Sequence, residues 1–364
     1  MSVMRLVLLT TTVFITFGFA GRVSAEEQKD PAQKPAEQKT EAVSAEEAQK
    51  KAEAEARQKA REAQDQAIDA VKQAGGTVRV DYAQRDVHPS PVVHVAFHGS
   101  RAEDSLISLL APFPKLKRID LSFSQMTDSS LAALDKFAEL EQIDLYGAKR
   151  VTDAGLAHLA KIPTLKQISL CGTAITDEGL AHLAALASLE QLDLDRTRVS
   201  DAGLEKLKAQ PLVKLTRIDL SNTRVTDTGL QYLTGMSALH ELSLAYTSIG
   251  DTGLAHLRAL TQLKRLDLDG TRVTDAGLAA LEPLQALEYL DLTGTTISDR
   301  GIDAIQRLKG LQRLRLGGTP ITDAGIERLQ GLEKLVNVSL EGSKVSDAGV
   351  EKLKKATPRI WVTR

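Results

Sequence analysis

The sequence has little cysteine, few aromatic residues and little net charge. The shortages of cysteine and of net charge each exclude a class of protein. The single cysteine, Cys171, cannot form an internal disulfide bond, so the fold is not a small scaffold held together by such bonds. Aromatic residues make up only 4% of the chain, and the formal net charge is -2. A nucleic-acid-binding surface is usually strongly basic, so we expect no nucleic-acid partner.

Long apolar runs are also scarce, and the chain has one, near the N-terminus. It extends from Leu6 to Ala20, follows the positive charge of Arg5 and precedes Val23-Ser24-Ala25. Its 15 residues are fewer than the roughly 20 that span a bilayer, whereas the pattern is typical of a secretory signal peptide. We therefore expect residues 1–25 to be a cleaved signal and the mature chain to begin at Glu26. The protein is then exported, to the periplasm, the cell envelope or the medium, and keeps no membrane span.

Residues 26–62 have a different composition, rich in Ala, Glu, Lys and Gln and almost without large apolar side chains. Such a segment cannot bury enough apolar surface to fold alone. Opposite charges four residues apart, as in Glu46/Lys50 and Glu53/Arg57, nevertheless favour a helix. We expect a charged spacer and leave open whether it is helical or disordered. A coiled coil is disfavoured because no apolar seam is sustained.

What the chain has in abundance is a repeat of about 24 residues. The stretch Leu263–Ala286 has the sequence LKRLDLDGTRVTDAGLAALEPLQA. The 24 residues before it and the 24 residues after it have nearly the same pattern. Leu266 and Leu268 alternate as in a short strand, and the leucines that follow Asp275 have helical spacing. One such unit cannot enclose its own apolar side, so it is stable only when stacked on copies of itself.

Ten full repeats, covering residues 115–357, can be counted from the aspartate that begins each predicted helix. We expect each aspartate to cap its own helix by accepting hydrogen bonds from backbone N–H groups. The glycine two residues later should permit close approach of adjacent turns, and only Ser130 replaces it. The expected caps are Asp128, Asp153, Asp177, Asp201, Asp227, Asp251, Asp275, Asp299, Asp323 and Asp347.

Incomplete units are expected to cover both ends of the array. Residues 63–114 form the predicted N-terminal cap, with a strand pattern at Thr77–Tyr82 and a degenerate repeat strand at Val92–Phe97. Residues 358–364 form a predicted closing strand. Without these units, the terminal repeats would expose their apolar faces to water.

The pattern LxxLxLxxTxVTDxGLxxLxxLxx, intact at Leu263–Ala286, resembles a leucine-rich repeat. It is similar to the ribonuclease-inhibitor-like and F-box-associated, cysteine-containing subtype and to exported bacterial leucine-rich repeat proteins. The resemblance implies an α/β solenoid, a horseshoe with a concave parallel sheet and convex helices, and a function in binding macromolecules. The spacing of strands, about 4.8 Å, against that of packed helices, about 8–10 Å, predicts the same curvature. The chain lacks an F-box, which argues against a role in ubiquitin ligation.

Carboxylates on neighbouring strands are the most plausible catalytic or metal-binding candidates. Such pairs can perform acid/base chemistry or hold a hard cation. Arginines two residues upstream, at Arg118, Arg217 and Arg265, are expected to neutralise them. We therefore favour a solvated charge ladder and predict no catalytic residue, metal or cofactor. The pairs are Asp120/Asp144, Asp193/Asp219 and Asp267/Asp291.

These observations predict a non-enzymatic, monomeric binding scaffold with a protein or glycan partner of unknown identity. The alternative is a structural, envelope-organising protein in which residues 26–62 act as a spacer or tether. Aromatic and arginine side chains are the usual anchors of interfaces, so those beside the predicted strands are candidate ligand-binding residues. One candidate patch comprises His98, Phe123, Tyr146 and Cys171, and the other comprises Arg224, Tyr246, Arg272 and Tyr289. The competing interpretation is that scattered surface aromatics carry no function.

Overall fold

The computed structural model describes residues 34–82, 90–99, 102–208 and 212–364, with side chains from residue 45. The chain divides into two units, residues 1–56 and residues 57–364. The predicted signal peptide, with its cleavage site before Glu26, lies outside the described residues. No helix among the described residues is both long and apolar enough to cross a membrane.

Helix α1, Lys34–Gln73, contains the described part of the predicted spacer. Its side chains are exposed from residue 45 to residue 63, and Lys50 pairs with Glu46 at 2.6 Å. The end of the helix belongs to the second unit, and Ala67 and Val71 there are part of that unit's hydrophobic core. The helix therefore changes from a solvated rod to a packed cap element as apolar residues return at helical spacing.

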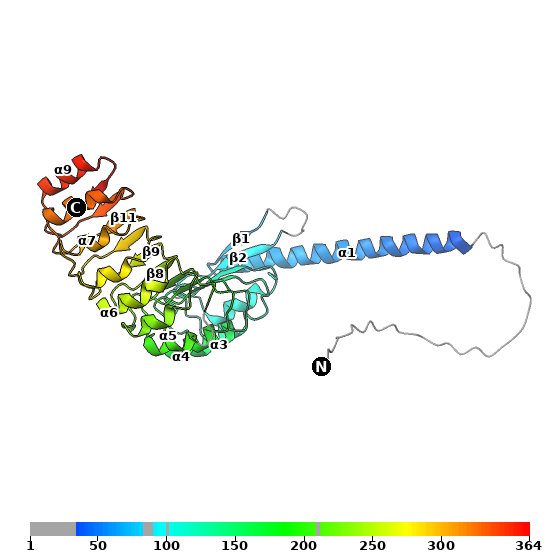
Figure 1. Ribbon diagram of the computed structural model, residues 1–364. Helices are drawn as coiled ribbons and strands as arrows, with labels where there is room; N and C mark the ends of the chain where they lie inside the picture. The colour runs from blue at the N-terminus through cyan, green and yellow to red at the C-terminus, as the bar shows by residue number, and fades with distance from the viewer. Residues whose placement is uncertain (1–33, 83–89, 100–101, 209–211) are drawn as a thin grey trace, which may run out of the picture. The chain divides into compact units, whose positions relative to one another are not determined.

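The second unit is built on one sheet of 13 strands that follow one another in chain order (Figure 1). Strand β1 is antiparallel to β2, and all later neighbours are parallel. The strands are β1 Thr77–Val80, β2 Val92–Ala96, β3 Arg118–Asp120, β4 Gln142–Asp144, β5 Gln167–Ser169, β6 Gln191–Asp193, β7 Arg217–Asp219, β8 Glu241–Ser243, β9 Arg265–Asp267, β10 Tyr289–Asp291, β11 Arg313–Arg315, β12 Asn337–Ser339 and β13 Trp361–Thr363. Strands β3–β12 belong to the ten predicted repeats, and the predicted solenoid is confirmed.

Short helices line the other side of the stack, and several are 3-10 rather than α (Figure 1). Each repeat leaves room for only one or two helical turns, and a single turn readily tightens to the 3-10 form. The α-helices of the repeats are α2 Asp128–Ala132, α3 Asp153–Leu159, α4 Asp177–Leu183, α5 Asp201–Leu207, α6 Asp251–Leu254, α7 Ile302–Ile305, α8 Asp323–Arg328 and α9 Asp347–Ala356. The 3-10 helices are η1 Asp104–Leu110, η2 Gly229–Leu233, η3 Ala255–Ala259, η4 Gly277–Leu281 and η5 Leu329–Gly331.

The core is a continuous stack of aliphatic side chains between the sheet and these helices. In the repeat that begins at Leu263, Leu266 and Leu268 from the strand side and Leu281 from the helix side are fully buried. Burying one such side chain contributes about 1.5–3 kcal/mol. Because each repeat supplies the same set, the core grows linearly along the array.

The aspartates do not cap their own helices, so that prediction is wrong. In five of the described helices the preceding Thr or Ser is the cap; Thr322, for example, accepts a hydrogen bond from the backbone N–H of Ala324 at 3.3 Å. Asp275 instead accepts the backbone N–H of Ser298, in the next repeat, at 2.8 Å and its hydroxyl at 2.5 Å. Each aspartate either begins its helix, as Asp251 does, or lies in the turn just before it, as Asp275 does, and its carboxylate bonds the following repeat.

The same two bonds recur along the array and form an aspartate ladder between repeats. Its members are Asp104 to Thr127, Asp128 to Thr152, Asp153 to Thr176, Asp177 to Ser200, Asp201 to Thr226, Asp251 to Thr274, Asp275 to Ser298, Asp299 to Thr322 and Asp323 to Ser346. Asp227 bonds the N–H of Gly250 and the hydroxyl of Thr252, and Asp347 bonds Arg364. The sequence analysis missed Asp104, although it lies one period before Asp128.

Candidate binding surface

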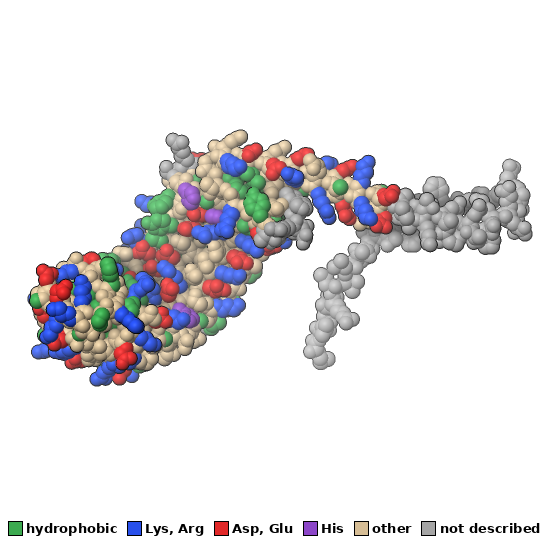
Figure 2. Space-filling model, turned by 90° about the horizontal axis from the view of Figure 1, so that it is seen from above, with side chains coloured by type: hydrophobic (Ala, Val, Ile, Leu, Met, Phe, Trp, Pro, Cys, Tyr) green, Lys and Arg blue, Asp and Glu red, His purple; other side chains and the backbone are tan. Residues whose placement is uncertain are grey.

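Each of the three-residue strands β3–β12 buries its second side chain and presents the first and third to the concave face. On β9, Arg265 is exposed, Leu266 is buried and Asp267 is half-buried. Figure 2 shows basic and acidic side chains interspersed over the face in view. Neither sign of charge dominates the face in this view.

A tight turn follows each strand, and its last residue has a left-handed backbone. We call the second and third residues after the strands β2–β12 the rim. The third residue has a φ of 54° to 88° in every one of these turns. These residues are Gly99, Phe123, Gly147, Gly172, Arg196, Asn222, Tyr246, Gly270, Gly294, Gly318 and Gly342.

Four of these left-handed positions carry a side chain where the other repeats have glycine. Phe123, Arg196, Asn222 and Tyr246 have φ values of 54° to 56°. Asparagine tolerates this conformation, but for other residues it costs roughly 1–2 kcal/mol. Burial of the two aromatic rings offsets little of this conformational cost, because Phe123 is 54% exposed and Tyr246 is 60% exposed.

In the first predicted patch the structure brings together Phe123 and Tyr146. Their rings meet edge to face with centroids 4.6 Å apart. Gly147 leaves space for this arrangement, since a Cβ there would lie 2.8 Å from the ring of Phe123. His98 is exposed, and its Nδ1 lies 3.0 Å from the hydroxyl of Ser122.

Cys171 does not offer a surface for a ligand, because it is only 4% exposed. Its thiol donates to Asp195 at 3.3 Å, and burial together with this bond raises the pKa of the thiol to about 12. The thiol is therefore protonated and unreactive at neutral pH.

The second predicted patch is less compact than expected. The ring of Tyr246 covers Gly270, where a Cβ would lie 2.7 Å from it, and its hydroxyl donates to Asp269 at 2.8 Å. Tyr289 lies on the concave face, under the guanidinium group of Arg265 at 3.7 Å. Among the described residues, the side chains of Arg224 and Arg272 form no bond to either tyrosine; both lie two residues beyond the left-handed position.

The sequence analysis missed the polar centre of the rim, which is Asp195. It accepts a hydrogen bond from the amide of Asn222 at 2.8 Å and lies 3.2 Å from the guanidinium group of Arg196. With the thiol of Cys171, it joins three successive repeats. A signal was present, because Arg196 and Asn222 replace the glycine found at this position in seven other turns.

The predicted carboxylate pairs serve mainly to close the turns. Asp144 accepts the backbone N–H of Tyr146 at 2.9 Å, and the equivalent bond recurs at Asp120, Asp193, Asp219, Asp267 and Asp291. The expected neutralisation by upstream arginines fails: among the described residues, none of the three arginines pairs with the aspartate on its own strand. Arg118 forms no ion pair with a described residue, and Asp120 lies 3.5 Å from His98 instead. Arg217 pairs with Glu241 at 3.0 Å, and Arg265 stacks on Tyr289. Without an arginine paired to it in the described part of the chain, Asp267 has a pKa that burial raises to about 6. Repulsion from Asp291 and Asp269 adds to this shift.

Replacing Asp267 by Asn is expected to stabilise the protein at pH 7.5 by about 1–2 kcal/mol, allowing for solvent screening of a partly exposed group. The amide oxygen keeps the bond to the N–H of Asp269, which is 3.0 Å from the carboxylate. Because the folded-state pKa is raised from 3.8 to about 6, the charged form opposes folding above pH 6. The wild type gains stability as the pH falls from 7 to 4, so the advantage of Asp267→Asn should vanish near pH 4. Urea unfolding at several pH values measures this, and an equal difference at pH 4 and pH 7.5 would contradict it.

Among the described residues, no three His, Cys, Asp or Glu side chains come together as metal ligands. The prediction that the protein has no metal, cofactor or catalytic residue stays a prediction.

Comparison with known proteins gives one family match and several structural likenesses. The leucine-rich repeat family matches residues 185–208, 213–233, 259–281 and 285–305. An internalin of Listeria monocytogenes is 20% identical, with a TM-score of 0.57 over 75% of this chain and 86% of its own. No curated protein sequence matches significantly. At this identity the likeness to the internalin concerns the fold alone.

Two further solved structures have lower structural scores. Internalin C2 of Listeria monocytogenes is 27% identical, with a TM-score of 0.45 over 64% of this chain and 91% of its own. A leucine-rich repeat protein of Leptospira interrogans is 18% identical, with a TM-score of 0.43 over 70% of this chain and 74% of its own.

Proposed function

The chain is a solenoid of leucine-rich repeats, and we propose that it is an exported, non-enzymatic scaffold that binds a partner protein through the rim and the neighbouring concave face. Solenoids of this kind offer a long, preformed surface rather than a closed pocket. A glycan is the other partner class that the sequence suggests.

The observation that carries this proposal is the pair of aromatic side chains at left-handed rim positions. Phe123 and Tyr246 hold a conformation that glycine adopts freely in seven equivalent turns. Strain of this kind persists where a side chain is needed for something other than stability. Aromatic and arginine side chains are typical anchors of protein interfaces, and Arg196 lies on the same rim between the two rings.

A second candidate function, a spacer or tether in the cell envelope, is favoured by helix α1. Its side chains from residue 45 to residue 63 are exposed, and it bears no sustained apolar face along this stretch. Removing residues 26–56 distinguishes the two functions. A binding scaffold should keep its partner without this segment, whereas a tether should lose its attachment to the envelope.

We expect the double variant Phe123→Gly with Tyr246→Gly to be as stable as the wild type or up to about 1 kcal/mol more stable, because strain is relieved. The same variant should bind its partner at least tenfold more weakly, since interface anchors contribute more than about 1 kcal/mol. Cross-linking in the exported fraction of the native cells, followed by mass spectrometry, identifies the captured partner. Urea unfolding measures stability.

Val213→Ala is the matched control, because Val213 is 54% exposed but lies before β7 and away from the rim. It should leave capture unchanged. If the double variant captures the same protein in the same yield, the rim is not the binding surface.

A further inference from the structure

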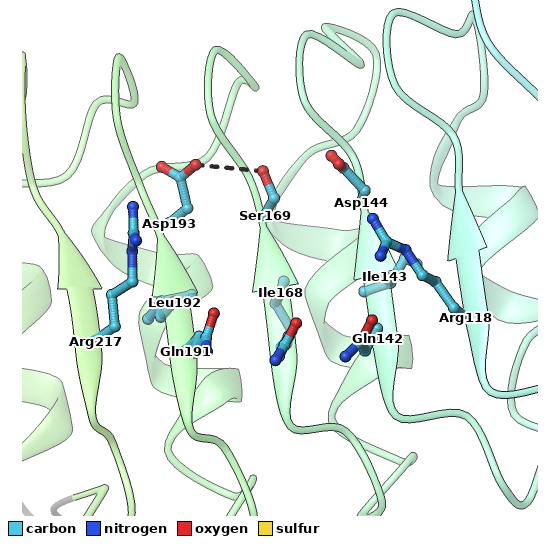
Figure 3. A pocket seen from close by; sticks show the side chains of 11 residues that line it. Arg118, Gln142, Ile143, Asp144, Ile168, Ser169, Gln191, Leu192, Asp193 and Arg217 are labelled. Carbon is cyan, nitrogen blue, oxygen red and sulfur yellow. Dashed lines mark hydrogen bonds between the residues drawn. The ribbon is translucent and has the colours of Figure 1, made fainter. Parts of the chain in front are cut away.

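The concave face is hollowed over strands β3–β7 by a groove of about 270 Å³ (Figure 3). It shares Arg118 and Gln142 with a second hollow, of about 500 Å³, that continues to the β1–β2 hairpin. The first groove alone crosses five strands, or roughly 19 Å at the usual spacing between strands. A groove of this length suits a chain-like ligand that runs across the strands.

One side of the groove is a row of amides, which we call the amide row: Gln142, Gln167 and Gln191. They are direct neighbours in the sheet and half-buried. Of the strands that the structure describes, no other has glutamine at this position. Within the described part of the chain none of the three amides forms a hydrogen bond, although each offers two donors and one acceptor. Arg118, at one end of the row, forms no ion pair with a described residue.

The other side is a row of oxygen acceptors, which we call the carboxylate row: Asp144, Ser169 and Asp193. One oxygen of Asp144 accepts the N–H of Tyr146 at 2.9 Å, and one of Asp193 accepts the N–H of Asp195 at 3.0 Å. These bonds fix the orientation of both carboxylates. Among the described residues, the second oxygen of Asp193 has only a long contact of 3.4 Å with the hydroxyl of Ser169 (Figure 3). Burial raises the pKa of Asp193, so this carboxylate is partly stripped of water.

The two rows exclude several classes of ligand. The groove lining holds two arginines and two aspartates, so its charges cancel. Phosphates or sugar acids would meet the carboxylate row and be repelled. An apolar helix would find no apolar wall, because Ile143, Ile168 and Leu192 point into the core. Each side of an extended peptide presents both N–H and C=O groups, so carbonyl oxygens as well as N–H groups would face the carboxylate row.

A hydroxyl group satisfies both rows, because it can donate to a carboxylate and accept from an amide or a guanidinium group. We propose that this groove binds a neutral polysaccharide chain, whose hydroxyls donate to the carboxylate row and accept from the amide row and Arg118. The groove lies on the concave face beside the rim and includes no rim residue, and its existence does not depend on the proposed protein partner.

Isothermal titration of the full chain with soluble hexasaccharides tests the proposal. The neutral probes are the hexamers of β-1,4-linked glucose, β-1,4-linked N-acetylglucosamine, α-1,4-linked glucose and α-1,6-linked mannose. The anionic probe is a hexamer of galacturonic acid, and the peptide probe is an unstructured hexapeptide of Gly, Ser and Ala. We expect at least one neutral hexamer to bind at millimolar concentration or below, and the anionic hexamer and the peptide to bind at least tenfold more weakly.

Variants assign the binding to the two rows. Gln142→Leu with Gln191→Leu, and separately Asp193→Asn, should each weaken binding of the neutral hexamer at least tenfold. Asn337→Leu is the control, because it removes an amide at the same strand position on β12, outside the groove. The rim variant Phe123→Gly with Tyr246→Gly should bind the hexamer within threefold of the wild type, which separates this site from the proposed function. Circular dichroism confirms that each variant is folded.

The proposal is overturned if no neutral hexamer binds, if the anionic hexamer or the peptide binds equally well, or if the row variants bind like the control.

Discussion

Replacing Gly253 by alanine is expected to destabilise the solenoid by roughly 2–4 kcal/mol, although glycine to alanine usually stabilises a helix. A Cβ at this position would lie 2.4 Å from the Oδ1 atom of Asp227 and 3.1 Å from its Cα, in the preceding repeat. Asp227 cannot move away freely, because it accepts the N–H of Gly250 at 2.7 Å. The methyl group must therefore push the two repeats apart or break a bond of the aspartate ladder.

Gly250 provides a control within the same turn. Its φ is -129°, and the nearest atom to a Cβ there would be 3.6 Å away, so Gly250→Ala should change stability little. Urea unfolding followed by circular dichroism compares the two variants. Equal urea midpoints for the two variants would show that the fold does not require the close approach of Gly253 to Asp227.

The period of the sequence predicted the solenoid because the same apolar spacing recurs in every repeat. The repeat period did not reveal which groups the aspartates bind. A carboxylate beside the first turn of a helix is favourable whether or not it accepts a hydrogen bond from that helix, so the local sequence does not distinguish the two cases. The true partner of Asp275, Ser298, is 23 residues away. Such a contact is set by the stacking of repeats, so the sequence around one helix cannot show it.

The rim was predictable in part. The left-handed turn could have been read from the glycine that recurs at one position, and Phe123, Arg196, Asn222 and Tyr246 are its exceptions. The burial of Cys171 and the raised pKa of Asp267 could not be read in this way. Both depend on how closely neighbouring strands cover a side chain. Five other repeats carry aspartate at the position of Asp267, so the residue type alone does not indicate the raised pKa.

Asp104→Ala is expected to destabilise the protein by about 3 kcal/mol, because Asp104 has more partners than the other members of the aspartate ladder. Its carboxylate accepts the N–H of Thr127 at 2.7 Å, the hydroxyl of Thr127 at 2.5 Å and the hydroxyl of Ser130. Ser130 occupies the position where the other repeats have glycine, next to the carboxylate of the preceding aspartate. Its hydroxyl donates a hydrogen bond to the carboxylate of Asp104, whereas a larger side chain would push this carboxylate away. Removing Asp104 therefore leaves the N–H and the hydroxyl of Thr127 without their acceptor and leaves the hydroxyl of Ser130 only the sulfur of Met126 as a described partner, at 3.0 Å. This junction is where the N-terminal cap meets the first full repeat.

The pH dependence distinguishes lost hydrogen bonds from a general packing defect. Burial alone would raise the pKa of Asp104, but the bonds from Ser130 and Thr127 outweigh it and hold the pKa below the ordinary value of 3.8. A depressed folded-state pKa contributes stability that is complete above pH 3.8 and is lost as the pH falls below it. The deficit of Asp104→Ala should thus be full at pH 7 and shrink below about pH 4. Asp135→Ala, which removes an exposed aspartate without a described partner, should show no deficit at either pH. A deficit for Asp104→Ala that is the same at pH 3 and pH 7 would mean that the charge of the carboxylate contributes nothing to this junction.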